Sequence, residues 1–435
     1  MRIAFIAAGS GSRFYCENCA GEGSLVRALR SRGHEIALAS FYLPVGDAEG
    51  NVAAHAPLFY GAIGMYLSHR LPVLRSAPAR LLRALDAPAL LALAGRFSGP
   101  TQPGRLEALT LSMLRGEEGR PSTNLGELLR WLESIRPDVV HLSNGLLLGV
   151  AGAIRRALGI PVSCTLQDED TWIESLGGRA RAVAWKILRE RAADVALFTP
   201  VSRYFGRLMA DHLGLSDERY VVVHPGIDLD SFPEAASSDG PPVIGYLSRI
   251  SEPMGAGLLA DAFILLAREG RFPGTRLRLM GGSTSADAQL VRSLRQRFVH
   301  AGLAESLEIK AGFGPRARAL FLGGISALCV PVLRGEAFGT FMLEAMAAEV
   351  PVVQPRLGGF PEVVQDTGGG ILYEPNTTEA LASALGRLLA DPEGSRTLGR
   401  AGRRAVAERY TVGRMAAGLE AAFERARCPA AARGA

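Results

Sequence analysis

Residues 329–355 read "CVPVLRGEAFGTFMLEAMAAEVPVVQP". A short apolar strand ends near Leu333, a glycine-containing turn follows, a helix begins around Thr340, and "PVVQP" opens another strand. The stretch also holds two glutamates eight residues apart, Glu336 and Glu344. In one continuous helix they would stand more than two turns apart, too far to share one small group. We therefore predict that Glu336 lies in a loop and that Glu344 lies one turn into the helix.

The same order of strand then helix runs through the rest of the chain. In the N-terminal half we predict strands in "RIAFIAA", "EIALASFYL", "PDVVHLS", "PVSCTLQ", "VALFTPVS" and "YVVVHPG", with helices such as "GSLVRALRSRG" and "LLLGVAGAIRRALG" between them. The order begins again with "VIGYLS", "RLRLMGG", "SLEIKAGF", "SALCVPV", "PVVQPR" and "GGILYE". Continuous apolar strands flanked by helices are typical of a parallel sheet covered on both faces. The sequence thus predicts an α/β fold with two Rossmann-like, doubly wound parallel-sheet domains.

Composition sets the expected domain boundaries. Residues 226–241 are rich in Pro, Ser, Asp and Gly and are predicted to be a linker between domains 1–225 and 242–410. The last residues, 411–435, are expected to form a helix that crosses back to the first domain. An irregular insertion at about 44–127 fits the alternation poorly. Two doubly wound domains in series predict a cleft, where the carboxyl ends of strands gather loops around a ligand.

The bulk composition is that of a globular protein kept in a reducing compartment. A chain of 435 residues, 48% of them hydrophobic, can bury substantial cores. Five scattered cysteines, with no charged-then-apolar leader and no long apolar run, favour a cytoplasmic protein. Cys16 and Cys19 form a C-x-x-C pair, for which packing or loop anchoring is favoured over zinc or redox use, because the other possible ligands are dispersed.

The net charge of +5 comes largely from arginine and hints at an anionic ligand or surface. Nucleic acid is disfavoured, because no basic run is interleaved with aromatic residues, which make up only 7% of the chain. One leucine-rich segment leaves two alternatives open, a peripheral membrane contact or an insertion that lines the cleft or packs on the first domain, of which the second is favoured. Its basic residues are Arg70, Arg75, Arg80 and Arg83.

The turn and helix of the opening stretch suggest chemistry. The free N–H groups at the helix start, with Gly339 permitting close backbone approach, predict an anion site suited to phosphate. A carboxylate accepts two hydroxyl hydrogen bonds, so one glutamate is expected to hold a ribose diol and the other a sugar hydroxyl. The alternative is a solvated loop glutamate followed by a helix glutamate favoured near the positive end of the helix dipole.

Together with "GYLSRI", "LMGG", "GGFPEVV" and "AERYT" in order and spacing, this stretch resembles the nucleotide-sugar half of glycosyltransferase family 4, retaining enzymes of GT-B fold. The resemblance covers most of the chain and is strongest from about Val243 to Tyr410. It implies a retaining hexosyltransferase that moves a sugar from a nucleoside diphosphate sugar, with a UDP-sugar as the expected donor, to an acceptor held by the first domain. It implies no further cofactor.

The resemblance also implies roles for single residues. Glu344 is expected to bind the ribose hydroxyls, and Glu336 to lie near the anomeric carbon and the sugar hydroxyls. Arg249 is expected to neutralise the leaving diphosphate, because a guanidinium matches phosphate oxygens in a bidentate manner. The other residues implied on the nucleotide side are Gly281 of "LMGG" and the backbone of Phe338, Gly339 and Thr340.

Two positions depart from the family pattern. Met254 stands where relatives usually carry a lysine, and the loss of a cation at developing negative charge costs several kcal/mol on the order of one removed oxyanion donor. Gln167 stands where many relatives carry a histidine near the transferred sugar; it forms hydrogen bonds but cannot take a proton. These departures keep two alternatives open, a repurposed or non-catalytic subunit that only binds the nucleotide sugar, and a transferase to a small non-sugar nucleophile.

Residues of the acceptor side are expected at strand ends of the first domain. His141 and Asn144, in "VVHLSNG", are interpreted either as acceptor-binding residues or as a hydrogen-bonded strand end. Asp168, in "DED", is interpreted as an acceptor contact or a helix cap, and a metal site is not expected there. Gly11 and Ser12 of the "GSGSRF" loop are expected to border the acceptor.

Overall fold

The computed structural model describes residues 1–8, 17–41, 107–119, 122–232, 240–284, 287–310 and 312–428. Contacts between Cα atoms divide the chain into two compact units. The first unit takes Met1–Gly11, Glu22–His224 and Met415–Ala435, and the second unit takes Ser12–Gly21 and Pro225–Arg414. Several residues considered above lie outside the described part: Gly11, Ser12, Cys16, the side chain of Cys19, and the segment with Arg70, Arg75, Arg80 and Arg83.

The first unit is built on a five-stranded sheet in which every named pair of strands is parallel, in the order β2-β1-β3-β4-β5. Residues 3–7 of β1 are all buried, so neither face of this strand meets water and its apolar run is continuous rather than alternating. The strands are β1 (Arg2–Ala7), β2 (Glu35–Ser40), β3 (Val139–Leu142), β4 (Val162–Leu166) and β5 (Leu197–Pro200).

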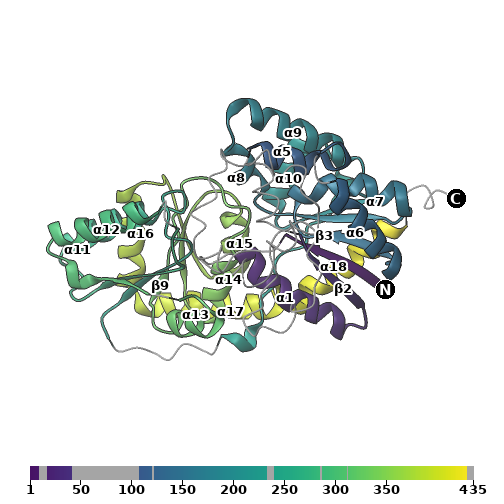
Figure 1. Ribbon diagram of the computed structural model, residues 1–435. Coiled ribbons are helices and arrows are strands. Elements are labelled where there is room, and N and C mark those ends of the chain that lie inside the picture. Colours follow the sequence, from purple (N-terminus) through teal and green to yellow (C-terminus); the bar gives the residue numbers. More distant parts are fainter. Residues whose placement is uncertain are drawn as a thin grey trace. The chain divides into compact units, whose positions relative to one another are not determined.

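Helices cover both faces of this sheet. The described ones are α1 (Glu17–Ser31), α5 (Glu107–Arg115), α6 (Ser122–Ile135), α7 (Ala151–Leu158), α8 (Glu169–Glu174), α9 (Gly178–Ala192), α10 (Arg203–Leu213) and α18 (Val412–Arg427), with short 3-10 turns η3 (Gly116–Glu118), η4 (Gly145–Val150) and η5 (Asp217–Arg219). α1 and α18 lie on one face and α7 and α9 on the other (Figure 1). Glu420 of α18 contacts Arg32 and His34, which follow α1, so the last helix is tied to the first.

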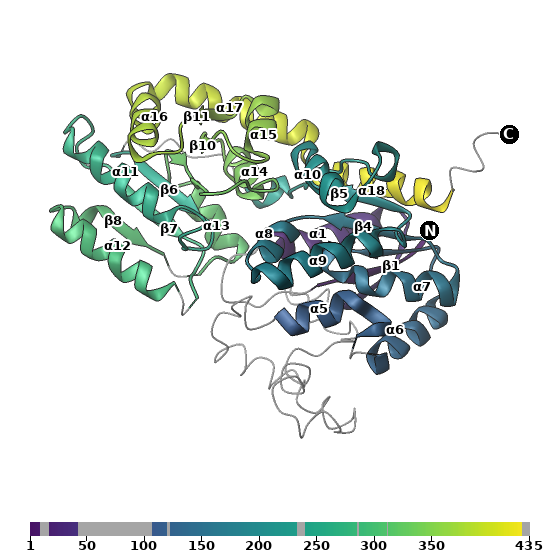
Figure 2. The same cartoon turned by 90° about the horizontal axis from the view of Figure 1, so that it is seen from above.

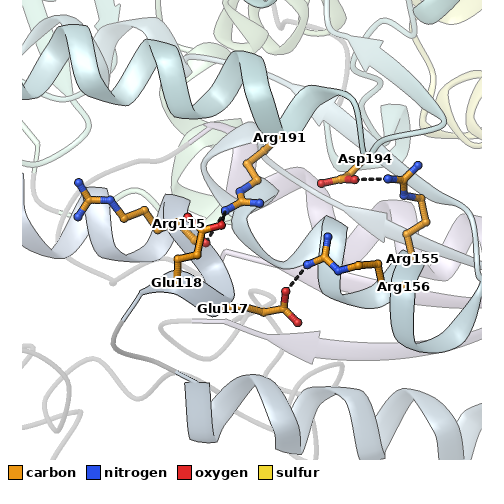
Figure 3. A network of polar contacts seen from close by, with 7 residues as sticks. All are labelled: Arg115, Glu117, Glu118, Arg155, Arg156, Arg191 and Asp194. Atoms are coloured by element: carbon orange, nitrogen blue, oxygen red, sulfur yellow. Dashed lines mark hydrogen bonds and ion pairs between the residues drawn. The ribbon is translucent and has the colours of Figure 1, made fainter.

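Ion pairs join the helices on the outer side of the first unit (Figure 3). Arg155 of α7 donates to Asp194 after α9 at 2.6 Å, and Arg156 pairs with Glu117 of η3. Arg191 of α9 donates to Glu118 at 3.1 Å and to the backbone oxygen of Arg115 at 2.8 Å. The arginines of this network therefore face carboxylates of their own unit.

The second unit repeats the architecture with six parallel strands in the order β11-β10-β9-β6-β7-β8. They are β6 (Val243–Leu247), β7 (Arg276–Met280), β8 (Leu307–Ile309), β9 (Ala327–Leu328), β10 (Val352–Pro355) and β11 (Gly370–Tyr373). Both sheets place β-strand carboxyl ends at one edge, which is where loops of an open α/β sheet gather around ligands.

The helices of the second unit also form two layers (Figure 2). α11 (Ala256–Arg268) packs on α12 (Ala288–His300) through stacked rings of Phe263 and Phe298, and on α16 (Thr378–Ala390). On the other face lie α13 (Pro315–Leu322), α14 (Thr340–Ala347), α15 (Phe360–Thr367) and α17 (Pro392–Arg409), of which α17 packs against α14 and α15. The 3-10 turns are η6 (Leu229–Ser231) and η7 (Ala304–Ser306).

Three details differ from the predicted elements. The strand predicted in "YVVVHPG" is wrong: Tyr220 forms one isolated bridge with Phe198, and the following residues make scattered bonds to the end of β5. The helix predicted in "LLLGVAGAIRRALG" is divided into η4 and α7. Within the segment expected to be irregular, at about 44–127, residues 107–118 and 122–127 are helical. Within the described residues, no helix is long and apolar enough to cross a membrane.

The two segments of the second unit that lead to His224 and to Met415 are bonded to each other. The amide of Ile227 donates to the oxygen of Tyr410, and the amide of Val412 donates to the oxygen of Ile227, at 2.9 and 3.0 Å. A side chain at Gly226 would meet the oxygen of Thr411 at 2.2 Å, so only glycine fits there.

Candidate active site

The loop from β9 into α14 has the conformation predicted from the spacing of Glu336 and Glu344, a loop that leads into a helix. Glu336 lies in the loop, half-exposed, and α14 begins at Thr340, with Glu344 buried one turn further on. Gly339 starts the helix with φ +84°, and a Cβ on it would lie 2.7 Å from the ring of Phe360. Glycine is therefore required at the helix start by both its backbone angle and its packing.

A second glycine-containing loop holds the backbone of Glu336. The amide of Gly359 donates to the oxygen of Glu336 at 2.8 Å. Gly358, at φ +58°, leaves room for this contact, since a Cβ there would lie 2.4 Å from the same oxygen. The "GGF" turn after β10 thereby fixes the loop that carries Glu336.

Glu344 is paired with an arginine that the sequence analysis did not identify. Nε of Arg318, on α13, donates to Oε2 of Glu344 at 3.0 Å, and the two residues are 8% and 4% exposed. The sequence shows two arginines, Arg316 and Arg318, in the helix "PRARALFL", but which of them pairs with Glu344 depends on the fold, because the pairing spans 26 residues.

Arg249 follows β6 and is also paired. Its Nε and Nη2 donate to the two carboxylate oxygens of Asp287 at 3.0 and 3.1 Å, and Nη2 also reaches Thr284 at 3.2 Å. Burial raises the pKa of Asp287, but the hydrogen bonds from Arg249 and Thr284 outweigh burial and hold that pKa below its ordinary value. The guanidinium is therefore held in a bidentate pair beside the carboxyl end of β6.

The turn with Met254 is bonded to the segment that leads toward Glu336. The amide of Leu333 donates to the oxygen of Pro253 at 2.9 Å, and a Cβ on Gly255 would meet the oxygen of Pro331 at 1.8 Å. Gly281, at φ +137°, packs against the backbone of Ser248, because a Cβ on Gly281 would lie 2.0 Å from the Ser248 oxygen. The loops after β6, β7, β9 and β10 are thus adjacent at one edge of the second sheet.

In the first unit, side chains at the ends of β3 and β4 bond to the backbone of neighbouring strand ends. The side-chain amide nitrogen of Gln167 donates to the backbone oxygen of Ser143 at 2.8 Å, and the side-chain amide of Asn144 donates to the backbone oxygen of Gln167 at 3.1 Å. The hydroxyl of Ser143 accepts from the amide of Ala8 at 3.2 Å. Gln167 and Asn144 therefore lie together, and the amide nitrogen of Gln167 is already engaged.

The "DED" sequence contributes a buried carboxyl. Glu169, fully buried, accepts from the amides of Gly145 and Gln167, both at 2.7 Å, and burial raises its pKa to about 8. Asp168 occupies the cap position of α8 at φ +58° without a side-chain cap bond, and burial raises the pKa of Asp170 to about 6. Across the described residues, no group of three or more His, Cys, Asp or Glu side chains could hold a metal ion.

His141 lies in the core of the first sheet. Its ring is 1% exposed, contacts Phe5 and Phe423, and bonds to the hydroxyls of Ser163 and Thr165 at 2.9 and 3.2 Å. Burial lowers its pKa to about 3, so the imidazole is neutral. Of the two interpretations of His141, this buried placement matches that of a hydrogen-bonded strand residue.

Two family descriptions match the chain, one for each half. Glycosyltransferase Family 4 matches residues 93–231, and Glycosyl transferases group 1 matches residues 241–391. The chain therefore belongs to the group 1, family 4 glycosyltransferases, which confirms the resemblance noted in the sequence.

Particular relatives include the GDP-mannose-dependent alpha-(1-6)-phosphatidylinositol monomannoside mannosyltransferase of Mycolicibacterium smegmatis, 31% identical over 237 residues, 51% of this chain and 60% of that protein. A glycogen synthase of Mycobacterium tuberculosis is 27% identical over 62% of this chain and 64% of its own length. The matches thus span about three fifths of these relatives.

Solved structures share the fold over nearly the whole chain. Sucrose-phosphate synthase from Thermosynechococcus elongatus aligns with a TM-score of 0.72 and 17% identity, covering 97% of this chain and 98% of that one. Anabaena HepE in complex with UDP-glucose aligns with a TM-score of 0.67 and 16% identity, covering 98% and 99%. The two parallel-sheet α/β units are those of the GT-B fold, as predicted.

Proposed function

We propose that this protein transfers a sugar from a nucleoside diphosphate sugar to an acceptor with retention of anomeric configuration. The observation that carries the proposal is the loop from β9 into α14, where Glu336, the Gly339 helix start and Glu344 follow one another at the carboxyl edge of the second sheet. A bound nucleotide sugar offers the matching groups in the same order, a sugar, a diphosphate and a ribose diol.

Each residue then has one role. Glu344 binds the ribose hydroxyls, and the backbone at the start of α14 faces the diphosphate. Glu336 lies at the sugar, and Arg249 stabilises the charge that develops on the leaving diphosphate. A phosphate oxygen of the leaving group accepts the proton of the acceptor, so Gln167 is not required as a base. The first unit holds the acceptor.

The donor proposed is a UDP-sugar, supported by Anabaena HepE, which was solved with UDP-glucose. The Mycolicibacterium relative is named as GDP-mannose-dependent, so the identity of the donor's nucleotide base needs a direct test. Isothermal titration of the protein with UDP-, GDP- and ADP-sugars should show binding of at least one; binding of none contradicts the proposal. Glu344→Ala should abolish that binding.

Turnover separates the transferase from a subunit that only binds. Mass spectrometry of a reaction with mixed nucleotide sugars and a host-cell extract should show a donor-dependent product or slow donor hydrolysis. Met254, in place of a lysine, is the feature that favours the non-catalytic alternative. Tight nucleotide-sugar binding with neither reaction would establish that alternative instead.

A further inference from the structure

Arg318 lies behind the glutamate assigned to the ribose. It is held at two points: Nε donates to Oε2 of Glu344 at 3.0 Å, and Nη1 donates to the backbone oxygen of Phe313 at 2.9 Å. Arg318 therefore has a defined direction, set by the end of its own helix and by α14. Its guanidinium is too buried to serve as a surface charge.

Stability alone does not account for this pair. Taking two charges out of water is costly, and replacing a buried ion pair with apolar residues of similar volume is often neutral or stabilising. α13 and α14 offer such a setting, because Phe321, Leu322, Leu343 and Met342 are all buried. A pair of apolar side chains would have joined the two helices as well.

The pair does, however, direct the carboxylate. Arg318 occupies Oε2, and no donor to Oε1 is recorded among the described residues. A carboxylate with one oxygen fixed by a guanidinium has the rotation of its plane restricted. The remaining oxygen is then available to accept from a hydroxyl in one orientation.

We infer that Arg318 is a positioning residue that aims Glu344 at the ribose, and that it sets the preference of this site for ribonucleoside over 2′-deoxyribonucleoside diphosphates. This inference rests on the proposed function, since it assigns a consequence to the same nucleotide site. Arg318 acts through Glu344 and need not contact the nucleotide.

The experiment compares matched nucleotides. UDP, GDP and ADP and their 2′-deoxy counterparts are titrated calorimetrically into the wild-type protein, and the ratio of the two Kd values is taken for the base that binds. A hydrogen bond to a charged group contributes about 1.5–3 kcal/mol, so the wild type should favour the ribonucleotide by roughly 10-fold to 100-fold. Arg318→Met should reduce this ratio to about threefold or less.

Arg278→Met is the matched control. Arg278 also donates through Nε to a glutamate, Glu308, at 2.6 Å, and through Nη1 to a backbone oxygen, that of Gly324, at 2.9 Å, but it joins β7 to β8. This variant should lose stability yet keep the wild-type ratio. If the ratio of Kd values falls in both Arg318→Met and Arg278→Met, the effect comes from general destabilisation and the inference is overturned.

Arg318→Lys covers the case in which Arg318→Met does not fold, since breaking a buried pair costs about 3–5 kcal/mol. Lysine keeps the charge but loses the fork that binds Glu344 and Phe313 together, so the ratio should fall by about threefold or more. A folded Arg318 variant with the wild-type ratio overturns the inference alone. A wild-type protein that binds none of the six nucleotides overturns the proposed function and the inference together.

Discussion

Asp287 holds Arg249 through both carboxylate oxygens, at 3.0 Å to Nε and 3.1 Å to Nη2. The positive charge of Arg249, which is assigned to the leaving diphosphate, is thus partly neutralised by the carboxylate of Asp287, which is 8% exposed. The pair directs the guanidinium, and it also makes the absence of a lysine at Met254 more consequential, because Arg249 is already partly compensated.

Asp287→Asn should lower turnover by about tenfold or more, because Arg249 loses a charge-assisted bond worth roughly 1.5–3 kcal/mol and with it a fixed direction. Steady-state kinetics with the donor identified by titration measure the effect. The thermal unfolding temperature serves as the control for folding, and an unchanged kcat would show that Asp287 does not position the cation.

Met254→Lys should raise turnover by about tenfold to a hundredfold, because a second cation would face the developing charge on the diphosphate. The side chain lies half-exposed in a turn that is bonded to Leu333, so a lysine fits without burial of its charge. Single-turnover rates with saturating donor measure the gain. No gain would mean that another residue supplies the cation or that the chemistry differs.

Gly358→Ala should displace the loop that carries Glu336, because the new Cβ would lie 2.4 Å from the Glu336 oxygen at a backbone angle of φ +58°. Gly368→Ala is the control: it shares a positive φ of +63°, but its Cβ meets only Ala401 at 4.0 Å. Both variants should lose about 1–2 kcal/mol from the backbone angle. Only Gly358→Ala should also lose turnover. Steady-state kinetics measure the turnover of both variants, and their thermal unfolding temperatures show that the loss of stability is the same.

Acid should destabilise the first unit through His141, whose pKa burial lowers to about 3. Between that value and its ordinary value of 6.5, the unfolded chain binds a proton that the folded chain does not, so stability falls as pH falls through this window. The contribution of His141 should fall by about 2 kcal/mol from pH 6.5 to pH 5. Glu169, whose pKa burial raises to about 8, contributes in the opposite sense over this range, so the loss is measured as the difference between the wild type and His141→Gln in urea unfolding at several pH values.

His141→Gln, which keeps a donor and an acceptor for Ser163 and Thr165, should remove the His141 contribution and so change the slope of the unfolding free energy against pH by about one proton. His300→Gln changes an exposed histidine of α12 and should leave the slope as in the wild type. A wild-type slope in His141→Gln would contradict the assignment.

Several site partners were beyond the reach of the sequence. Asp287 precedes α12, Arg318 sits within α13, and Glu169 lies in a run of three acidic residues, where nothing local separates a buried carboxyl from a solvated one. The partners are 38, 26 and 24 residues from the groups they contact. Such pairs depend on which strands become neighbours, which periodicity does not encode.

The two parallel-sheet units, the start of α14 at Thr340 and the need for a glycine at position 339 were readable from local patterns, because strands buried on both faces are continuously apolar and a tight helix start requires glycine. Only the tertiary structure decided that His141 is a core residue and that Arg249 and Glu344 are each held by an oppositely charged partner. A buried charge is stable only when a partner is near, and that distance exists only in the folded chain.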